Sequence, residues 1–453
     1  MLFGVPGLKR ISVSIVALII VCIALISCGK KNPTAIPSTI SSKPSGLTFR
    51  VFISNPLFPA GTGTGGAGPF FPVLNIVNAQ LDVLSTSVVN VTGTITQPGL
   101  MALAPNLKYT VVYSQIGNTV AVVDNSTETV AKVAGSTTPV PAIALPGLTE
   151  SIAVSPFATS AYVAVPTAPV FGENPGTVQV LNLQNGSTTA SIPVPGAHWV
   201  VCSPDGNHVL VFSDNSDTVT VISTILIGTN TDPRSYITGF DRPVWGIFTG
   251  NSSAFVMNCG AQCGGTAAGV SVVNLGATSP SSTTTVDAAT YALLNNTTLY
   301  VVGTPPGSNT CDGTPTAATT CGRLSIIDTA SMTVAGSAVI TDGYHDRMQI
   351  SQNGQLYIGS HSCTNINVSG GEVRGCLSIF NTTNGSIVIP PNNGDVTGIQ
   401  QITGRDIVYL IQNGALQIYD ADTNQLQYTP NNTQNNNGQV DIVGQLYDVK
   451  LVN

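Results

Sequence analysis

Charged residues are scarce in this chain. Only 8% of its 453 residues are Asp, Glu, Lys or Arg, whereas an ordinary soluble domain carries roughly 25%. The 15 Lys and Arg residues against 22 Asp and Glu residues give a net charge of −7, so the chain lacks the basic surface that nucleic-acid binding requires. Long helices are also disfavoured, because their exposed faces need Glu, Lys and Arg. We therefore expect no nucleic-acid partner and little helix.

Ser, Thr, Asn, Gly and Pro take the place of the missing charge. The apolar share of 42% is normal, so the chain can bury a core and is not expected to be disordered. Gly, Pro, Asn and Ser favour turns, and short apolar runs between turns predict strands. The composition therefore predicts an all-β protein.

The first thirty residues carry an export signal. Lys9 and Arg10 precede an apolar stretch from Ile11 to Ile26, which is short for a bilayer span and typical of a secretory signal. The segment Leu25–Gly29 resembles the lipobox of bacterial lipoproteins, and the resemblance implies that Cys28 is lipidated and becomes the new N-terminus. The alternative is a signal anchor in which Cys28 has no role.

Cysteine spacing supports export independently. Six further cysteines form three close pairs, which are Cys259 with Cys263, Cys311 with Cys321, and Cys363 with Cys376. Local pairs suit an oxidising compartment, where each disulfide closes one loop. A zinc site would need CxxC knuckles and nearby histidines, so we predict disulfides and no metal. Cys202 lies in an apolar run and is predicted to be a buried, inert thiol.

From residue 48 onward the chain repeats a pattern of three predicted strands. The clearest copy runs from Trp199 to Ser223 and contains an apolar strand, the turn Pro204–Asn207 and two alternating strands. Equivalent first strands begin near Leu100, Ser151, Trp199, Val244, Tyr291, Arg347 and Gly398. The steps between equivalent positions are about 46 to 56 residues, a period that indicates the blades of a β-propeller.

The two ends of the chain have the pattern of one further blade cut in half. Residues 48–55 and 73–78 are predicted as its second and third strands, and residues 446–452 as its first strand. Pairing of these ends in one sheet would close the ring and leave no open edge. The sequence therefore predicts an all-β propeller of eight four-stranded antiparallel blades. Seven blades would follow if the terminal strands joined an existing blade.

Several segments resemble a known family of repeats. They are Phe52–Asn55, Ser203–Gly206, Phe255–Asn258 and Tyr300–Gly303. Together with closing strands of the TVTVI type, they resemble the YVTN family of bacterial propellers, which is related to lactonase-like and cytochrome d1-type propellers. The resemblance covers nearly all of the chain after the signal and implies the propeller fold. It implies little about function, because propellers serve as enzymes, scaffolds and binding proteins.

The lipobox and the repeats together predict the domain organisation and the location. Residues 1–27 would be a lipoprotein signal peptide, residues 28–47 a flexible tether, and residues 48–453 a single propeller domain. Loss of the signal removes two positive charges and changes the net charge from −7 to −9. Because Lys30 rather than Asp follows Gly29, the lipoprotein resemblance implies the outer membrane in a cell with two membranes. We expect a monomer in the bacterial cell envelope, on the periplasmic or extracellular side.

Long segments follow the second strands of five blades, whereas the turns after first strands are short. The long segments are residues 56–71, 166–175, 259–268, 304–322 and 361–375. All three predicted disulfides lie in or next to them, and in a four-stranded blade these loops open on one face of the ring. Long loops confined to one face mark a working surface, although unconstrained drift in loop length would give the same pattern.

Charged residues gather in the connections that lead into the inner strands. These residues are Glu150, His198, Asp241, Arg242, His345, Asp346, Arg347 and Asp395. Such a ring at the mouth of the central channel could bind a small polar ligand. Its members could equally satisfy one another as ion pairs, which is the more common case. His208 and His361 lie outside the ring and receive no predicted role.

Catalytic motifs are absent from the sequence. There is no GxSxG elbow, HExxH pair, phosphate-binding loop or Rossmann fingerprint, and the only tryptophans are Trp199 and Trp245, too few for the tryptophan-docked propellers of quinoprotein dehydrogenases. We predict no cofactor. His345, Asp346 and Arg347 are the candidates for the acid–base work on a lactone that lactonase-like relatives would suggest.

Two functional hypotheses follow. The first is a binding or scaffold module, anchored to the membrane through the lipid on Cys28, that holds an envelope protein, a glycan or a small polar ligand on its long-loop face. It predicts that the tether reaches the ring on the opposite, short-turn face, so that the long loops point away from the membrane. The second is a lactonase-like hydrolase that acts at the mouth of the central channel.

Overall fold

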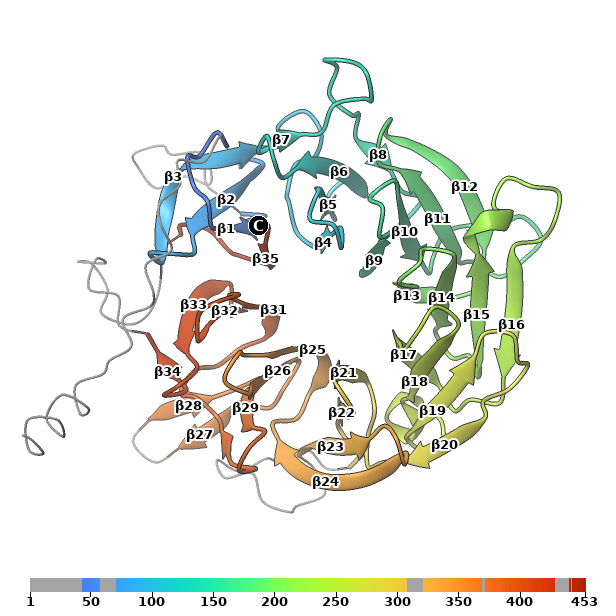
Figure 1. Ribbon diagram of the computed structural model, residues 1–453, viewed down its shortest axis with the longest axis vertical. Coiled ribbons are helices and arrows are strands. Elements are labelled where there is room, and N and C mark those ends of the chain that lie inside the picture. Colours follow the sequence, from blue (N-terminus) through green and yellow to red (C-terminus); the bar gives the residue numbers. More distant parts are fainter. Residues whose placement is uncertain (1–42, 58–70, 308–320, 369–370, 428–439, 441) are drawn as a thin grey trace, which may run out of the picture. The chain divides into compact units, whose positions relative to one another are not determined.

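The chain folds into a ring of β-sheets. A computed structural model describes residues 43–57, 71–307, 321–368, 371–427, 440 and 442–453. Figure 1 shows the sheets arranged radially around a central opening. Within the described residues there are eight blades of four antiparallel strands, one of which carries a fifth short strand. The prediction of an all-β propeller with eight blades is therefore confirmed.

The blades are numbered in chain order, and their strands are given from the innermost outward. Blade 1 consists of β35 (Val449–Leu451), β1 (Arg50–Ser54), β2 (Val73–Asn78) and β3 (Val83–Asn90). Blade 2 consists of β4 (Met101–Leu103), β5 (Tyr109–Ser114), β6 (Thr119–Asp124) and β7 (Thr129–Val130), with β8 (Ile143–Ala144) also paired to β6. Blade 3 consists of β9 (Ser151–Val154), β10 (Ser160–Val165), β11 (Thr177–Asn182) and β12 (Ser187–Pro193). Blade 4 consists of β13 (Ala197–Cys202), β14 (His208–Ser213), β15 (Thr218–Ser223) and β16 (Arg234–Thr238).

The remaining four blades follow the same order. Blade 5 consists of β17 (Pro243–Phe248), β18 (Ser253–Asn258), β19 (Gly269–Asn274) and β20 (Ser282–Thr285). Blade 6 consists of β21 (Tyr291–Asn295), β22 (Thr298–Gly303), β23 (Gly322–Asp328) and β24 (Thr333–Ile340). Blade 7 consists of β25 (Tyr344–Ile350), β26 (Gln355–His361), β29 (Leu377–Asn381) and β30 (Ile387–Val388), with the hairpin β27 (Ile366–Val368) and β28 (Glu372–Arg374) inserted. Blade 8 consists of β31 (Val396–Gln401), β32 (Ile407–Gln412), β33 (Ala415–Asp420) and β34 (Gln425–Leu426). Two short 3-10 helices, η1 (Thr224–Leu226) and η2 (Gly260–Cys263), lie in loops.

The middle strands of the blades are apolar because both of their faces are covered. Every residue of β5 and of β32 is buried, since each blade packs against a neighbour on either side. The outermost strand β3 instead alternates between half-buried and exposed residues along most of its length. Apolar runs therefore mark the middle strands, and alternation marks the edge of a blade.

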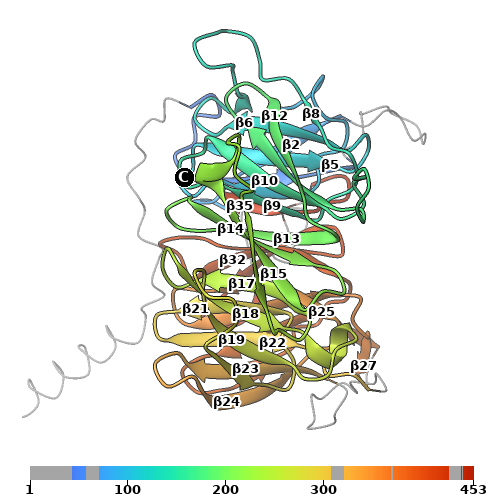
Figure 2. The same cartoon turned by 90° about the vertical axis from the view of Figure 1, so that its right-hand side faces the viewer.

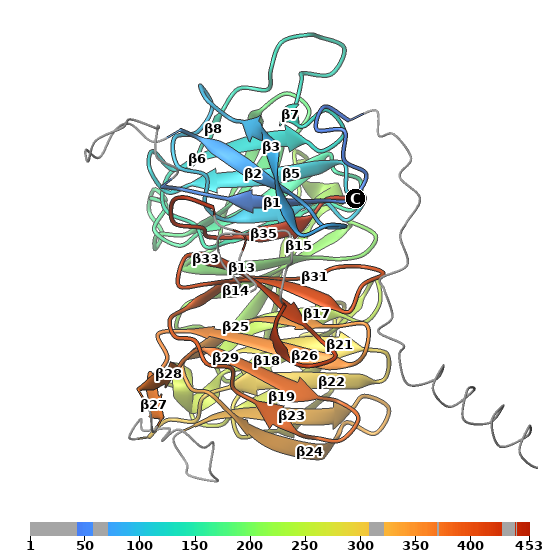
Figure 3. The same cartoon turned by 90° about the vertical axis from the view of Figure 1, so that its left-hand side faces the viewer.

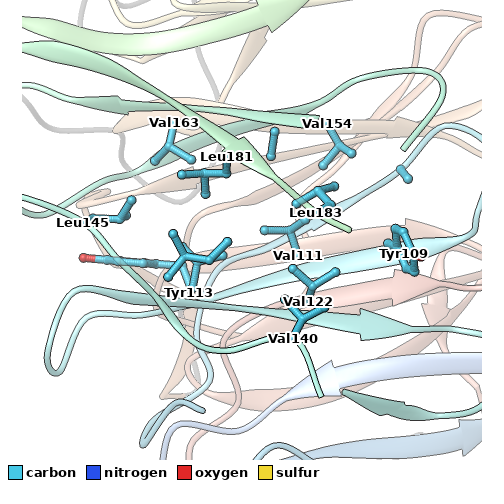
Figure 4. Close-up of a cluster of buried hydrophobic side chains, with 14 of the residues drawn as sticks. Tyr109, Val111, Tyr113, Val122, Val140, Leu145, Val154, Val163, Leu181 and Leu183 are labelled. Atoms are coloured by element: carbon cyan, nitrogen blue, oxygen red, sulfur yellow. The ribbon is translucent and has the colours of Figure 1, made fainter. Parts of the chain in front are cut away.

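The core lies between neighbouring blades. Figure 4 shows one such layer, in which Val111 and Val122 of blade 2 belong to the same cluster as Val154 and Leu181 of blade 3. Burial of one such side chain contributes about 1.5–3 kcal/mol. Each blade is thus stabilised by its two neighbours, and the ring must close for every blade to have both.

The two ends of the propeller domain meet in blade 1. Strand β35 pairs antiparallel with β1, with Val51 opposite Leu451 and Ile53 opposite Val449. The prediction that the terminal segments share one sheet is confirmed. This pairing removes the open strand edge that would otherwise invite association with other chains.

We call the pairing of β35 with β1 the seam of the ring. Two buried ion pairs lie on either side of it. The side chain of Arg50 is 1% exposed, and its Nη1 lies 2.6 Å from Oε1 of Glu128, in the turn between β6 and β7. On the other side, Arg405 before β32 forms two bonds of 2.6 and 2.7 Å with the carboxylate of Asp82, before β3. Removal of one partner of such a pair leaves a buried charge without compensation. The pairs therefore make blade 1 dependent on both of its neighbours.

The predicted signal peptide and the lipidation site Cys28 lie outside the described residues. Residues 43–47, at the end of the predicted tether, are described, and Ser45 donates hydrogen bonds from its backbone N and its Oγ to the carboxylate of Glu128 at 2.7 and 2.6 Å. No helix in the described parts of the chain has the length and apolar character to cross a bilayer.

The ring has two different faces. The turns between first and second strands, such as residues 203–207, and the turns between third and fourth strands form the short-turn face. The loops between second and third strands and the connections between blades form the long-loop face. Figures 2 and 3 show the hairpin of β27 and β28 projecting at one side of the ring, and this hairpin belongs to the long-loop face.

Two of the three predicted disulfides are present in the described residues. Cys259–Cys263 closes the loop after β18, and Cys363–Cys376 closes the loop after β26. Cys311 lies outside the described residues, so its bond to Cys321 stays a prediction. Cys202 is free and half-buried beside the channel, and burial raises the pKa of its thiol to about 12, which keeps the thiol unreactive.

Candidate functional site

The innermost strands of all eight blades line a central channel. The cavity inside it has a volume of about 380 Å³ and is bounded by residues at or next to β4, β9, β13, β17, β21, β25, β31 and β35. A second cavity, of about 410 Å³, lies on the long-loop side and is called the mouth. Glu150 and Trp199 line both cavities, so the mouth and the channel adjoin.

Four neighbouring blades place large flat side chains at one level of the channel. These are Trp199 of β13, Trp245 of β17, Tyr291 of β21 and Arg347 of β25. The rings of Trp199 and Trp245 meet edge to face with centroids 5.8 Å apart, and those of Trp245 and Tyr291 are 4.7 Å apart. Three aromatic rings beside one guanidinium make a floor that suits a ligand with a flat apolar face.

A β-bulge at the start of four inner strands redirects one side chain. The bulged residues are His198, Val244, Asp346 and Thr397. A bulge interrupts the alternation of side chains along a strand and aims one of them differently. His198 lines the mouth, and Asp346 faces His361, which also lines the mouth.

The same register explains the position of His345. It precedes the bulge and corresponds to buried residues in three other blades, which are Ala197, Pro243 and Val396. His345 is 0% exposed, and burial lowers its pKa to about 4, so the ring is neutral at pH 7. The structure therefore buries His345 behind the inner strand, apart from the mouth.

His198 links two carboxylates across neighbouring blades. Its Nδ1 lies 2.7 Å from Oδ1 of Asp214, and its Nε2 lies 3.1 Å from Oε2 of Glu150. Burial opposes the charge on the ring, but hydrogen bonds to Asp214 and Glu150 raise the pKa of His198 to about 9. The ring is therefore protonated at neutral pH. The side chains of Glu150 and Asp214 remain 71% and 51% exposed, so they can still accept hydrogen bonds from a ligand.

A second cluster contains Asp346, Arg347 and His361. The carboxylate of Asp346 lies 3.0 Å from Nη1 of Arg347 and 3.8 Å from Nδ1 of His361. The nearby carboxylate of Asp346 raises the pKa of His361. His361 has no predicted role, because it lies outside the predicted ring, at the end of a second strand. The pairing of Tyr344 with His361 brings His361 to the mouth. This position could have been predicted by pairing the two strands residue by residue, starting from the turn that joins them.

Asp241 and Arg242 are neighbours with different roles. The Asp241 carboxylate accepts hydrogen bonds from the backbone N of Thr266 and of Ala267 at 3.0 and 2.7 Å, so it holds the loop after β18. Arg242 lines the mouth, with its Nη1 3.8 Å from Oδ1 of Asp217. Only the second of these predicted residues is available to a ligand.

Two further carboxylates hold the long loop of blade 7. Asp395 accepts a hydrogen bond of 2.8 Å from the backbone N of Ser362. Asp342, which is not among the predicted site residues, accepts bonds of 2.7 Å from both the N and the Oγ1 of Thr364. Asp395 is thus a loop anchor.

Apart from the buried His345, the predicted ring of charge therefore divides into three groups. Glu150, His198 and Arg242 line the mouth, and Arg347 lines the channel beside Asp346. Asp241 and Asp395 anchor loops. Most members are paired with other protein groups, and in the described part of the chain no cluster of three or more His, Cys, Asp or Glu side chains could hold a metal ion.

Solved structures share this fold at low sequence identity. The chain is similar to dihydro-heme d1 dehydrogenase NirN in complex with DHE, with a TM-score of 0.60, 11% identity, and coverage of 90% of this chain and 75% of that chain. It is also similar to a functionally unknown protein from Desulfotomaculum acetoxidans, with a TM-score of 0.45, 12% identity, and coverage of 88% and 99%. No protein-family model and no curated protein sequence matches the chain. At these identities the likeness to NirN shows the propeller fold alone.

Proposed function

We propose that this chain is a lipid-anchored propeller of the bacterial cell envelope that binds a small polar ligand in its mouth. The observation that carries the proposal is the bridge from Glu150 through protonated His198 to Asp214, at a cavity of about 410 Å³. A concave site of several hundred Å³ with aromatic walls and a few convergent polar groups is the usual form of a small-ligand site.

The chemistry of the mouth suits a neutral polyol such as a fragment of a glycan. Hydroxyl groups can donate to the exposed carboxylates of Glu150 and Asp214, and they can accept from the guanidinium of Arg242. The C–H face of a sugar ring can pack on Trp199 or Tyr344, which line the same cavity. Charges of both signs surround the mouth. The carboxylates would repel a strongly anionic ligand, and Arg242 and protonated His198 would repel a strongly cationic one.

The envelope location rests on the lipobox at Cys28 and on the YVTN-like segments. The two described disulfides are consistent with an oxidising compartment. Ser45 binds Glu128 in a turn of the short-turn face, which supports a tether that reaches the ring from that side. The mouth would then open away from the membrane.

The likeness to NirN, a dihydro-heme d1 dehydrogenase, raises the question whether the mouth fits a haem. A haem iron takes an axial ligand such as the lone pair of a neutral histidine. Both ring nitrogens of His198 lie on carboxylates, and carboxylates raise the pKa of His198 and of His361. These residues do not fit a haem iron, and we assign no cofactor to the mouth.

The alternative function is a lactonase-like hydrolase. His345, one of its three candidate residues, is fully buried, which leaves Asp346 and Arg347, and these two are paired with each other. Turnover of any member of a lactone panel by the purified protein, with loss of turnover in Asp346→Asn, would favour the hydrolase over the binding module.

Saturation-transfer NMR with the full chain and a panel of mono- and oligosaccharides tests the proposal. We expect at least one sugar to bind, and Asp214→Asn to weaken its binding about tenfold because a charge-assisted hydrogen bond is lost. Asp232→Asn is the matched control, since Asp232 is 55% exposed and paired with Arg234 away from the mouth. Absence of binding across the panel, or equal losses in both variants, would contradict the proposal.

A further inference from the structure

Exposed apolar side chains gather beside the mouth on the long-loop face of blades 1 to 3. They are Ile116, Leu148, Phe171, Val443 and Tyr447, with exposures of 55%, 48%, 106%, 66% and 39%. We call this group the apolar crescent. A single exposed apolar residue is ordinary, whereas a contiguous group marks an interaction surface.

A shallow cavity joins the members of the apolar crescent. Its volume is about 160 Å³, and its lining includes Pro56, Gln115, Leu148 and Tyr447. Ile116 follows Gln115 in the chain. The carbonyl of Val443 accepts a hydrogen bond of 2.9 Å from Asn55, which precedes Pro56. Leu148 and Tyr447 therefore line one hollow, and Ile116 and Val443 lie next to the segments that form its edge.

Phe171 lies in the loop between β10 and β11, which packs against the segment that carries Leu148. A Cβ placed on Gly147 would lie 2.9 Å from Oγ1 of Thr167, so this loop and the connection before β9 are in close contact. Glu150, at the end of the same connection, lines the shallow cavity as well as the mouth. The apolar crescent thus extends from the rim of the mouth outward.

The rest of the long-loop face has a different composition. In its described parts, the loops after the second strands of blades 4 to 8 and the connections that join these five blades contain none of the exposed large apolar side chains, whereas Val443 and Tyr447 lie in the connection from blade 8 to blade 1. The other exposed apolar residues, such as Phe157 and Ile225, lie on the short-turn face or on outer strands, apart from Phe71 in the loop between β1 and β2 of blade 1. The apolar crescent is therefore a local feature of three blades.

Carboxylates outnumber cations beside the apolar crescent. The described long-loop segments of blades 1 to 3 contain Glu150, Glu173 and the buried Asp448, against a single cation, Lys132, which closely follows β7 at the outer edge of blade 2. Glu150 and Glu173 are both exposed. Exposed carboxylates next to an apolar surface complement a partner that carries a cation beside its own apolar side chains.

We infer that the apolar crescent docks a segment of a partner protein in which apolar side chains stand next to Lys or Arg. A second copy of this chain is a poor occupant, because a two-fold contact would bring the same carboxylates together. An anionic lipid surface would be repelled by the same groups. The inference extends the proposed function, on which it rests only for the outward direction of the long-loop face.

Two short synthetic peptides test this inference. One alternates Phe or Leu with Lys, and the other has Glu in place of each Lys. In fluorescence-anisotropy titrations with the full chain, the Lys peptide should bind, more weakly as salt increases, and the Glu peptide should bind at least about tenfold more weakly. Absence of binding by the Lys peptide, or equal binding of the two peptides, would overturn the inference.

Variants locate the binding on the surface. Leu148→Asp and Phe171→Asp should each weaken the Lys peptide about tenfold. Phe157→Asp is the matched control, because Phe157 is an aromatic residue exposed at 68% in the turn between β9 and β10 on the short-turn face. Equal weakening by the control, or no weakening by the two crescent variants, would show that the peptide does not bind at the apolar crescent and would overturn the inference.

Further measurements separate the other occupants. If the wild type floats with phosphatidylglycerol vesicles and Phe171→Asp does not, the occupant of the apolar crescent is a lipid surface. If the wild type dimerises in analytical ultracentrifugation and Phe171→Asp does not, the occupant is a second copy of this chain. Either result would overturn the proposed protein partner. Asp214→Asn should leave peptide binding unchanged while it weakens sugar binding. A failure of the peptide-binding inference can therefore be distinguished from a failure of the proposed sugar binding in the mouth.

Discussion

The two halves of the long-loop face are built by different means. In blades 5 and 7 the long loops are closed by Cys259–Cys263 and Cys363–Cys376 and held by carboxylates. In blades 1 to 3 the described long loops contain no cysteine, and they expose the apolar crescent. We call the first of these the cystine half. One repeated scaffold thus presents a polar, cross-linked surface and an apolar one.

Hydrogen bonds between neighbouring blades connect the loops of the cystine half to one another. Gln262, in the disulfide loop of blade 5, accepts a bond of 2.8 Å from the backbone N of Thr304 in blade 6. The Oγ1 of Thr304 donates a bond of 2.7 Å to the carbonyl of Gly343 at the start of blade 7. Cross-linked loops suit a fixed wall for the mouth, and an exposed apolar surface suits a separate docking site. Loop chemistry, rather than the fold, decides what each half can bind.

The largest effect is expected at the short-turn end of the blade 1 seam, in Glu128→Gln. This change leaves the guanidinium of Arg50, which is 1% exposed, without its opposite charge. We expect the free energy of unfolding to fall by about 3–5 kcal/mol, measured by urea denaturation, which does not screen charge. A loss below about 1 kcal/mol would show that the seam of blade 1 does not depend on this pair.

Removal of a disulfide from the cystine half should have the next largest effect. The double variant Cys363→Ala, Cys376→Ala opens a loop with a sequence separation of 13 and should lower the free energy of unfolding by about 3 kcal/mol. Binding of the Lys peptide to the apolar crescent should stay the same. Loss of peptide binding in this variant would contradict the independence of the two halves.

The pH dependence of stability tests the His198 bridge, which lies between the two halves. Its pKa of about 9 in the fold lies above its ordinary value of 6.5. The protonated ring therefore stabilises the fold below about pH 6.5, and this contribution is lost as the pH rises through 9. We expect a loss of roughly 1 kcal/mol, since the two carboxylates are half exposed or more. Urea denaturation across this range should show the loss in the wild type but not in His198→Asn.

The smallest effect on stability is expected within the apolar crescent itself. Leu148→Asp and Phe171→Asp change exposed side chains, so the free energy of unfolding should change by no more than about 0.5 kcal/mol. Urea denaturation of these variants beside Phe157→Asp measures this. A large loss in Leu148→Asp would mean that Leu148 belongs to the core and would remove it from the docking surface.

The fold could be predicted because each blade repeats one pattern. The apolar first and second strands, such as the copy that starts at Trp199, and the pairing of residues 446–452 with 48–55 follow from periodicity and from the cost of an open edge. The observed pairing of β35 with β1 agrees with that reasoning. Repetition thus supplies the long-range information that a single sequence usually lacks.

The mouth was predicted only in part, because its geometry depends on bulges and on pairing between strands. A bulge separates His345 from Asp346, although the two are adjacent in sequence. His361 and Asp214 reach the mouth from the ends of second strands, far in sequence from the inner strands. The apolar crescent was not anticipated, since its members lie in separate loops of three blades and share no motif.

Hydrogen–deuterium exchange of the full chain with and without the Lys peptide tests most directly whether the apolar crescent, and not the cystine half, binds the peptide. The account predicts slower exchange in residues 115–118, 145–150, 166–176 and 442–448, and unchanged exchange in residues 259–268 and 361–376. Protection of the disulfide loops, or of the short-turn face, with no change around the apolar crescent would contradict it.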